Sequence, residues 1–296
     1  MTDDDPTRRN RSTDDTDIAL RRPDGGVVTG QRGADPPGGR PADAATTNEL
    51  GAGDPDVRLE ARSLAFAYGD LQILEDVSVT ATAGDVTALI GPNGTGKTTL
   101  LRALAGIHEP TAGTVEYRGP DVPRPIGYLP QRPSFRPGFT VLETLAFYAS
   151  LVGEDRADAM EHLDRVGLGD AADRRVDALS GGMTRLVGIA QATIGSPPVV
   201  VLDEPASGLD PGMSPRVFEV ARAVADTGTA VVLTSHDLAL VERTADEVLL
   251  LDDGVVAERG RPASITARLD VDTLQAAYEA SVVGALDRVR VQGESA

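Results

Sequence analysis

The segment that most restricts how this chain can fold is a glycine-rich run between a short apolar stretch and a helical pattern. It reads Gly91, Pro92, Asn93, Gly94, Thr95, Gly96, Lys97, Thr98 and Thr99. Residues 86–90 before it are predicted to form a buried strand, and residues 97–105 after it a helix. Small residues let backbone N–H groups converge on a phosphate, and the helix start adds the positive end of its dipole. The pattern therefore predicts a phosphate-binding loop in a parallel α/β fold.

Two side chains of this loop are predicted to act on a nucleotide. Lys97 would reach the β- and γ-phosphates, and the Thr98 hydroxyl would ligate Mg²⁺. Lys97 is the only lysine of the chain, at a position that needs a compact ammonium on a long stem. A chance match in a glycine-rich chain is the alternative, and the strand–loop–helix context argues against it. The loop alone does not distinguish kinases, GTPases, motor ATPases and transporters.

A second apolar run, residues 199–202, ends in two carboxylates, Asp203 and Glu204. A buried strand that ends in this way places its carboxylates at the sheet edge where open α/β folds bind ligands. Asp203 is predicted to hold Mg²⁺ through water, and Glu204 to polarise the attacking water. An isolated Asp-Glu pair at a strand end would more often be a surface turn. The phosphate-binding loop upstream favours the catalytic interpretation.

A short motif lies between these two segments and reads Leu179, Ser180, Gly181 and Gly182. Ser180 is predicted to cap a helix, because apolar residues recur at helical spacing after it. The hydroxyl, the N–H groups of the glycines and the helix dipole would then form a second anion site. Alone, these four residues are more often an ordinary helix start. Their place about twenty residues before Asp203 makes the signal specific.

Taken in order, these motifs resemble those of the nucleotide-binding subunit of an ATP-binding cassette (ABC) transporter, over about residues 57 to 262. The resemblance implies a P-loop NTPase parallel-sheet core with an N-terminal antiparallel β-subdomain and an inserted helical subdomain, about residues 138–190. It also implies that the chain binds ATP and Mg²⁺ and hydrolyses ATP. Four further residues match functional positions of the family: Tyr68 for stacking on adenine, Gln131 for sensing Mg²⁺ and coupling to the membrane partner, Asp210 for the dimer interface, and His236 for the γ-phosphate.

The resemblance also assigns these residues to groups. Glu204, His236 and Gln131 form the catalytic set, and Thr98, Gln131 and Asp203 the Mg²⁺ ligands. In such proteins two subunits close head to tail over two ATP molecules. The residues that would act on the ATP of the other subunit, in a homodimer or a heterodimer, are Ser180, Gly181, Gly182 and Asp210.

A separate integral membrane permease is the second partner that the resemblance implies. It would place the chain in the cytoplasm, peripheral on the inner face of the membrane. Residues 140–175 are predicted to be helical, beginning with a capping box of Thr140 and Glu143, and to dock on the permease. Phe135, Phe139 and Phe147 are candidates for the docking groove, and ordinary subdomain core explains them equally well.

Two departures from the family pattern bear on the direction of transport. Met183 stands where Gln is common, and the basic cluster that usually follows is reduced to Arg185. This form of the motif resembles ABC-2-type export systems for drugs, polysaccharides or copper more than nutrient importers. We therefore expect an exporter, with the motor of an importer as the alternative. The cargo is not predicted, because the substrate pathway lies in the permease.

A soluble ABC-type ATPase in DNA repair, chromosome structure or translation is the main competing function. Chromosome-type members split the cassette with long coiled coils, and no sustained heptads occur here. Translation-type members carry two cassettes and a basic linker, whereas this chain has one cassette and an acidic composition. A small-molecule kinase would lack an acceptor-substrate domain and would leave the Ser180 motif unexplained.

Composition limits the partners and the organisation of the chain. Its net charge is −18, from 46 acidic and 28 basic residues, which disfavours nucleic-acid binding. Acidity with one lysine favours a salt-rich cytoplasm, where surface charges are screened, and a GC-rich genome is the alternative. Cysteine is absent, and no apolar run approaches the roughly 18 residues that cross a bilayer. Residues 1–55 are predicted to be a disordered tail, residues 56–262 the ATPase domain, and residues 263–296 a short helical extension.

Overall fold

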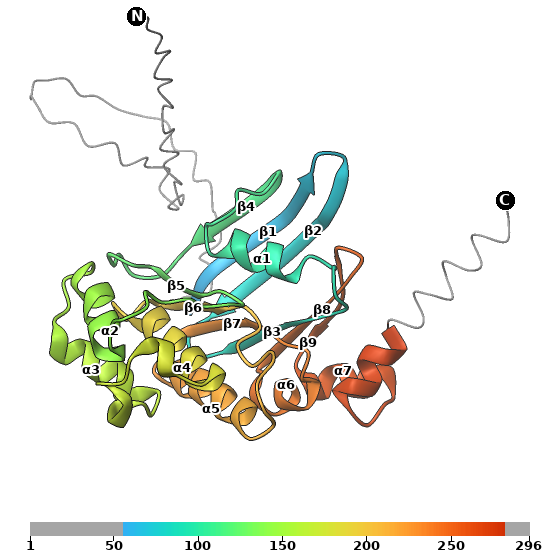
Figure 1. The fold of residues 1–296 in the computed structure, drawn as a ribbon. Coiled ribbons are helices and arrows are strands. Elements are labelled where there is room, and N and C mark those ends of the chain that lie inside the picture. Colours follow the sequence, from blue (N-terminus) through green and yellow to red (C-terminus); the bar gives the residue numbers. More distant parts are fainter. Residues whose placement is uncertain (1–55, 282–296) are drawn as a thin grey trace, which may run out of the picture.

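The computed structural model describes residues 56–281, drawn as a ribbon in Figure 1. The predicted acidic tail, residues 1–55, and residues 282–296 of the predicted extension lie outside this range. Within it, two sheets are present, and helices pack against both faces of the larger one.

The larger sheet has six strands in the order β5, β6, β7, β3, β8, β9. Neighbouring strands are parallel, except that β9 is antiparallel to β8. The buried strands predicted at residues 86–90 and 199–202 are confirmed as β3 and β6. The strand bounds are β3 Val86–Ile90, β5 Ile126–Leu129, β6 Val199–Leu202, β7 Ala230–Thr234, β8 Glu247–Asp252 and β9 Val255–Gly260.

The central strands are apolar without interruption because both of their faces are covered. In β6, Val199 and Val201 belong to the core that includes α1, Lys97–Leu104. Val200 and Leu202 belong to the core on the opposite face. Successive side chains of a strand point to opposite faces, so one short strand contributes to two cores.

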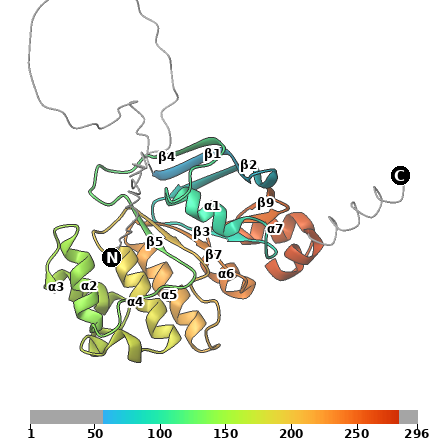
Figure 2. The ribbon, with the colours of Figure 1, turned by 45° about the horizontal axis from the view of Figure 1, so that its top comes forward.

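The smaller sheet is antiparallel, in the order β2, β1, β4. Its strands are β1 Val57–Tyr68, β2 Leu71–Thr82 and β4 Ala112–Tyr117. The register of β1 against β2 shifts between Ala61 and Leu64. Helix α1 packs between the two sheets through Leu100 and Leu101, and Figure 2 shows it beneath the smaller sheet. This packing holds α1, the helix that directly follows the phosphate-binding loop, in place.

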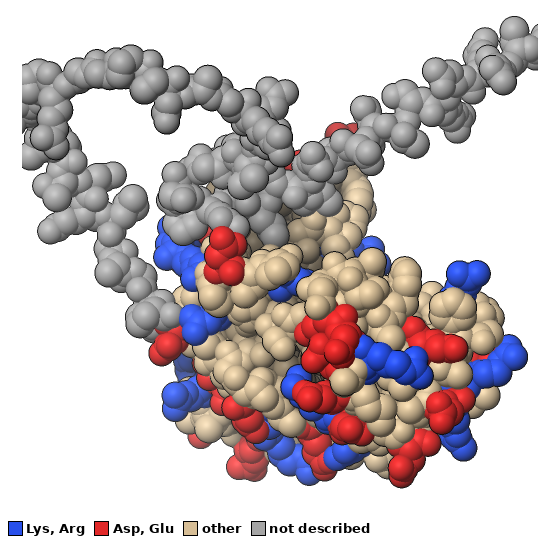
Figure 3. All heavy atoms as spheres, turned by 90° about the vertical axis from the view of Figure 1, so that its left-hand side faces the viewer, with Lys and Arg blue, Asp and Glu red and all other residues tan. Residues whose placement is uncertain are grey.

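The chain between β5 and β6 is helical, as predicted. It forms α2 Val141–Ser150, α3 Arg156–Arg165, two 3₁₀ turns at Gly169–Ala171 and Val176–Ala178, and α4 Gly181–Thr193. The predicted capping box is confirmed: Glu143 N donates to Thr140 Oγ1 at 3.1 Å, and Thr140 N donates to the Glu143 carboxylate at 2.8 Å. Helices α2 and α3 project to one side of the sheet (Figures 1 and 2). Acidic and basic side chains are interspersed on that side (Figure 3).

Helices α5, Met213–Asp226, and α6, Leu238–Thr244, pack in the same core as α4. After β9, helix α7, Pro262–Leu269, ends at Asp270, whose φ of 54° is left-handed. Helical structure resumes at Leu274, and both Leu274 and Ala277 are fully buried. The described part of the predicted helical extension therefore contains two helical segments separated by a break. None of the helices within residues 56–281 is long and apolar enough to cross a bilayer.

Candidate active site

The phosphate-binding loop connects β3 to α1, as the sequence predicts. Two of its positions require glycine. A Cβ on Gly91 would lie 2.2 Å from the carbonyl oxygen of Leu251, and one on Gly96, whose φ is 92°, would lie 2.7 Å from the Leu74 side chain. Gly96 precedes the first residue of α1, and no side chain caps this helix. The first N–H groups of the helix therefore remain for an anion.

Lys97 and Thr98 contact the loop and the neighbouring strand. The Lys97 ammonium donates hydrogen bonds to the carbonyl oxygens of Gly91, at 2.8 Å, and Pro92, at 2.7 Å. Burial lowers the pKa of Lys97, and the charges of Glu204 and nearby Asp203 raise it. The Thr98 hydroxyl donates to Asp203 Oδ1 at 3.1 Å. The two motifs that lie about a hundred residues apart in the sequence are therefore in direct contact.

Asp203 and Glu204 directly follow β6, and one threonine of β7 holds them both. The Thr234 hydroxyl donates to Asp203 Oδ1 at 3.1 Å and accepts a hydrogen bond from Glu204 N at 2.7 Å. Glu204 has a φ of 48°, which is uncommon for a residue other than glycine and costs about 1–3 kcal/mol. Sequence reasoning missed Thr234, although a hydroxyl residue at the end of an apolar strand, two residues before His236, was a visible signal.

Glu204 faces His236. Glu204 Oε1 and His236 Nε2 lie 3.0 Å apart, without the alignment of a hydrogen bond. Burial raises the pKa of Glu204 and Asp203 raises it further, whereas Lys97 and Arg185 lower it. Burial lowers the pKa of His236, and so does the charge of Lys97. A buried carboxylate with a raised pKa accepts a proton more readily, which suits a general base.

A cavity of about 330 Å³ brings half of the predicted site residues together. It lies where residues following β3, β5, β6 and β7 meet, at the carboxyl edge of the sheet, which is where ligands bind in open α/β folds. Its lining consists of Ile73, Asn93, Gly94, Gly96, Lys97, Thr98, Thr99, Gln131, Glu204 and His236.

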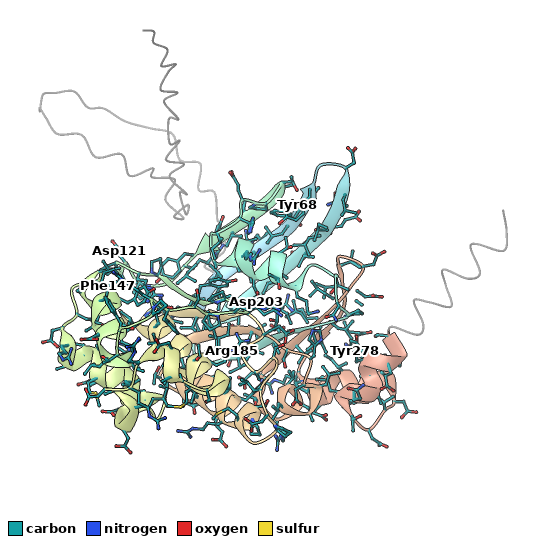
Figure 4. The ribbon with its side chains drawn as sticks, in the orientation of Figure 1. Tyr68, Asp121, Phe147, Arg185, Asp203 and Tyr278 are labelled. Atoms are coloured by element: carbon teal, nitrogen blue, oxygen red, sulfur yellow. The ribbon has the colours of Figure 1, made fainter. Side chains whose placement is uncertain are left out.

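Several predicted residues do not line this cavity. Gly91, Pro92 and Thr95 form the turn behind it, and the Thr95 hydroxyl donates to the Pro92 carbonyl at 2.9 Å. Tyr68, at the end of β1, is 51% exposed and packs edge-to-face on Phe66. In Figure 4, Tyr68 lies on the smaller sheet and Asp203 in the middle of the molecule.

The Ser180 motif also lies outside the cavity, at the start of α4. Ser180 Oγ accepts a hydrogen bond from Met183 N at 3.3 Å, which confirms the predicted cap. Gly182 packs closely on α5, since a Cβ there would lie 2.4 Å from Met213 Cγ. Asp210 Oδ1 accepts hydrogen bonds from Gly212 N and Met213 N, both at 3.0 Å. The two segments that are predicted to act on the ATP of the other subunit therefore lie next to each other, at the start of α5.

The carboxylate of Asp203 suits a Mg²⁺ site. Its Oδ1 bonds to Thr98 and Thr234, and its Oδ2 is buried without a hydrogen-bond partner. Hydroxyl and carboxylate oxygens are the ligands that Mg²⁺ prefers, with water and nucleotide phosphates completing its shell. No group of three or more His, Cys, Asp or Glu residues gathers for a metal within residues 56–281.

A phosphate-binding loop in contact with a buried acid pair, at the carboxyl edge of a parallel sheet, defines a nucleoside-triphosphatase of the P-loop class. The family model for ABC transporters matches residues 74–207. A Nod factor export ATP-binding protein from Paraburkholderia xenovorans is 33% identical over 224 residues, which cover 72% of this chain and 74% of that protein. A cobalamin import ATP-binding protein from Halobacterium salinarum is 36% identical over 244 residues, covering 77% and 61%.

The solved structure of the ATP-binding subunit of an ABC transporter is also similar. It has a TM-score of 0.67 and 28% identity, and the match covers 76% of this chain and 99% of that one. The chain belongs to the ABC transporter family of ATP-binding subunits, which hydrolyse ATP to drive transport.

Proposed function

We propose that this chain energises an ABC exporter through a separate membrane permease, at the cytoplasmic face of the membrane. The observation that carries the proposal is the convergence of Lys97, Thr98, Gln131, Glu204 and His236 on one cavity. Export is supported by the relative that serves Nod factor export and by the exporter-like form of the motif after Ser180.

Each residue of the cavity has a role in this proposal. Lys97 and the N–H groups at the start of α1 bind the phosphates. Thr98, Asp203 and Gln131 would hold Mg²⁺, which would supply positive charge to the phosphates. Glu204 takes a proton from the attacking water. His236, whose Nε2 lies 3.0 Å from Glu204 Oε1, contacts the γ-phosphate next to Glu204.

A second nucleotide-binding subunit completes the site. Ser180, Gly181, Gly182 and Asp210 lie outside the cavity of their own subunit, and Gly181 is exposed. The start of α4 is therefore accessible to the ATP of another copy, or of a homologous subunit, and its dipole favours the γ-phosphate. ATP binding would close such a dimer and hydrolysis would reopen it.

The permease is proposed to dock on α2. Phe147 of this helix and Leu151, directly after the helix, are 55% and 67% exposed, so two large apolar side chains about one turn apart are open to a partner. The three phenylalanines considered for the groove differ. Phe135 packs on the core, and Arg136 lies over the ring of Phe139, 4.9 Å from its centre. Phe147 is thus the phenylalanine best placed to contact a permease, and no nucleic-acid partner is proposed.

The motor of an importer is the second candidate. The observation that favours it is the 36% identity to the cobalamin import protein of Halobacterium salinarum.

Co-purification from the membranes of the source cells in high salt tests this function. We expect a tagged chain to retain a polytopic membrane protein after detergent extraction, and that protein's topology would distinguish export from import. The double variant Phe147→Ser, Leu151→Ser should lose the partner while keeping basal ATPase activity. A chain that is absent from membranes and associates with nucleic acid or with soluble proteins would refute the proposal and favour the soluble ATPase.

A further inference from the structure

We propose that Arg185 of α4 is a positioning residue for ATP hydrolysis, which joins the loop carrying Gln131 to the loop carrying Ser207 and Asp210. This inference rests on the ATPase function proposed above. The two loops follow neighbouring strands. One lies beside the cavity, and the other is proposed to cross the dimer interface. Arg185 would hold the two loops in a fixed position relative to each other.

Helix α4 packs closely against β5. A Cβ on Gly188 would lie 2.4 Å from Leu129 Cδ1, and one on Gly127 would lie 1.9 Å from the carbonyl oxygen of Ala192. Gly127 therefore requires glycine for this packing, and a side chain at Gly188 would displace that of Leu129. Arg185 precedes Gly188 by three residues, so it lies on the same face of the helix. Its side chain is directed toward the end of β5.

The guanidinium reaches two loops at once. One of its terminal nitrogens donates to the carbonyl oxygen of Gln131 and lies 3.5 Å from that of Pro130. The other terminal nitrogen donates to the carbonyl oxygen of Ser207 at 3.3 Å. Figure 4 labels Arg185 and Asp203 near the centre of the view, and the charge of Asp203 acts on the guanidinium.

This link begins where the strand ladder ends. Strands β5 and β6 are parallel neighbours, and their ends are joined by the bond from Asp203 N to the Leu129 carbonyl at 2.9 Å. Beyond it, the two loops separate. Arg185 spans the gap and is 91% buried, so water cannot readily replace its bonds to the carbonyl oxygens.

The geometry requires a forked donor. A guanidinium carries five N–H groups in a fixed plane and can bond two loops simultaneously, whereas a lysine ammonium is a point donor on a flexible stem. The charges of Asp203 and Glu204 also offset the cost of burying this cation. Loss of the fork should therefore let Gln131 and the Ser207–Asp210 segment move independently.

The test compares Arg185→Met and Arg185→Lys with a matched control, Arg165→Met. Arg165 is also an arginine of the helical subdomain, but it is 56% exposed, and it forms an ion pair with Glu161 at 3.4 Å. We expect Arg185→Met to lower kcat by about 10- to 100-fold, with KM for ATP changed by less than about twofold. It should also raise the Mg²⁺ concentration needed for half-maximal activity. The kcat of Arg185→Lys should lie between those of the parent and Arg185→Met, and the kcat of Arg165→Met should equal that of the parent.

Circular dichroism and urea unfolding identify variants that do not fold. If Arg185→Met fails to fold, Arg185→Lys tests the inference instead, and its kcat should still be at least about threefold below that of the parent. A folded Arg185 variant with unchanged kcat and Mg²⁺ dependence overturns the inference, as does a fall in kcat that only follows the folded fraction. If the parent chain itself hydrolyses no ATP, the proposed function fails instead, so the two failures are distinguishable.

Discussion

Thr234→Val is expected to destabilise the protein and slow hydrolysis together. The side chain of Thr234 is fully buried, and its hydroxyl bonds to both Asp203 and the backbone N–H of Glu204. Valine has nearly the same shape but neither donates nor accepts a hydrogen bond. The substitution therefore removes two buried bonds without creating a large cavity, and it releases a glutamate held in a left-handed conformation.

The magnitude follows from the groups left without partners. Losing the hydrogen bond to a charged carboxylate costs about 1.5–3 kcal/mol, and leaving a buried N–H unsatisfied costs about 1–3 kcal/mol. Asp203 keeps its hydrogen bond from Thr98. We therefore expect Thr234→Val to lower the free energy of unfolding by about 3 kcal/mol, near the lower limit of the sum of these two costs. A displaced Glu204 should lower kcat by about 10- to 100-fold, while ATP affinity, which depends on the loop at Lys97, should change little.

The assay is urea unfolding followed by circular dichroism, since the chain contains no tryptophan, together with steady-state ATPase kinetics. The matched control is Thr144→Val. Thr144 is 4% exposed, and its hydroxyl makes one bond, to the Thr140 carbonyl at 2.8 Å in α2. It should cost about 1 kcal/mol and leave kcat unchanged. A Thr234→Val protein with parental turnover and a loss below about 0.5 kcal/mol would refute the reasoning.

Three further predictions follow from the same contacts and from the composition. Lys97→Ala should lose most nucleotide affinity in equilibrium binding, because no other lysine is present to replace it; unchanged affinity would contradict the assignment of the loop. Burial lowers the pKa of His162, although Glu154 opposes the shift, so the unfolded chain binds the proton first and stability should be lost as pH falls below about 6.5. Urea unfolding of His162→Gln should show a smaller loss of stability at low pH than the parent does. The same pH dependence in both proteins would exclude His162 as the cause. Activity should fall in dilute buffer and return in concentrated salt, whereas full activity at low salt would reject the saline interpretation.

The sequence predicts the parts of this fold that have local signatures. Strand β3, helix α1 and the caps at Thr140 and Ser180 follow from residues within a few positions of one another. The pairing of β5 with β6 joins segments about seventy residues apart, and no local pattern encodes it. The resemblance to a family assigned Gln131 to the site, but only the strand order explains why it meets Glu204.

The least predictable features are contacts between distant segments. The bonds of Thr234 to the acid pair, and of Arg185 to two loops, depend on strand order and on the close approach of α4 to β5. Asp210 illustrates another limit. Its side chain bonds to the start of α5 in its own subunit, so its proposed role across a dimer interface cannot be read from local pattern.

The most direct test of the central claim is the mass of the Glu204→Gln variant with and without ATP and Mg²⁺, measured by light scattering during gel filtration. The account predicts that this variant binds ATP, hydrolyses it about 10²- to 10⁴-fold more slowly than the parent, and elutes at twice the 30.8 kDa chain mass only when ATP is present. A variant that stays at the single-chain mass with ATP bound, or that turns ATP over at the parental rate, would contradict it.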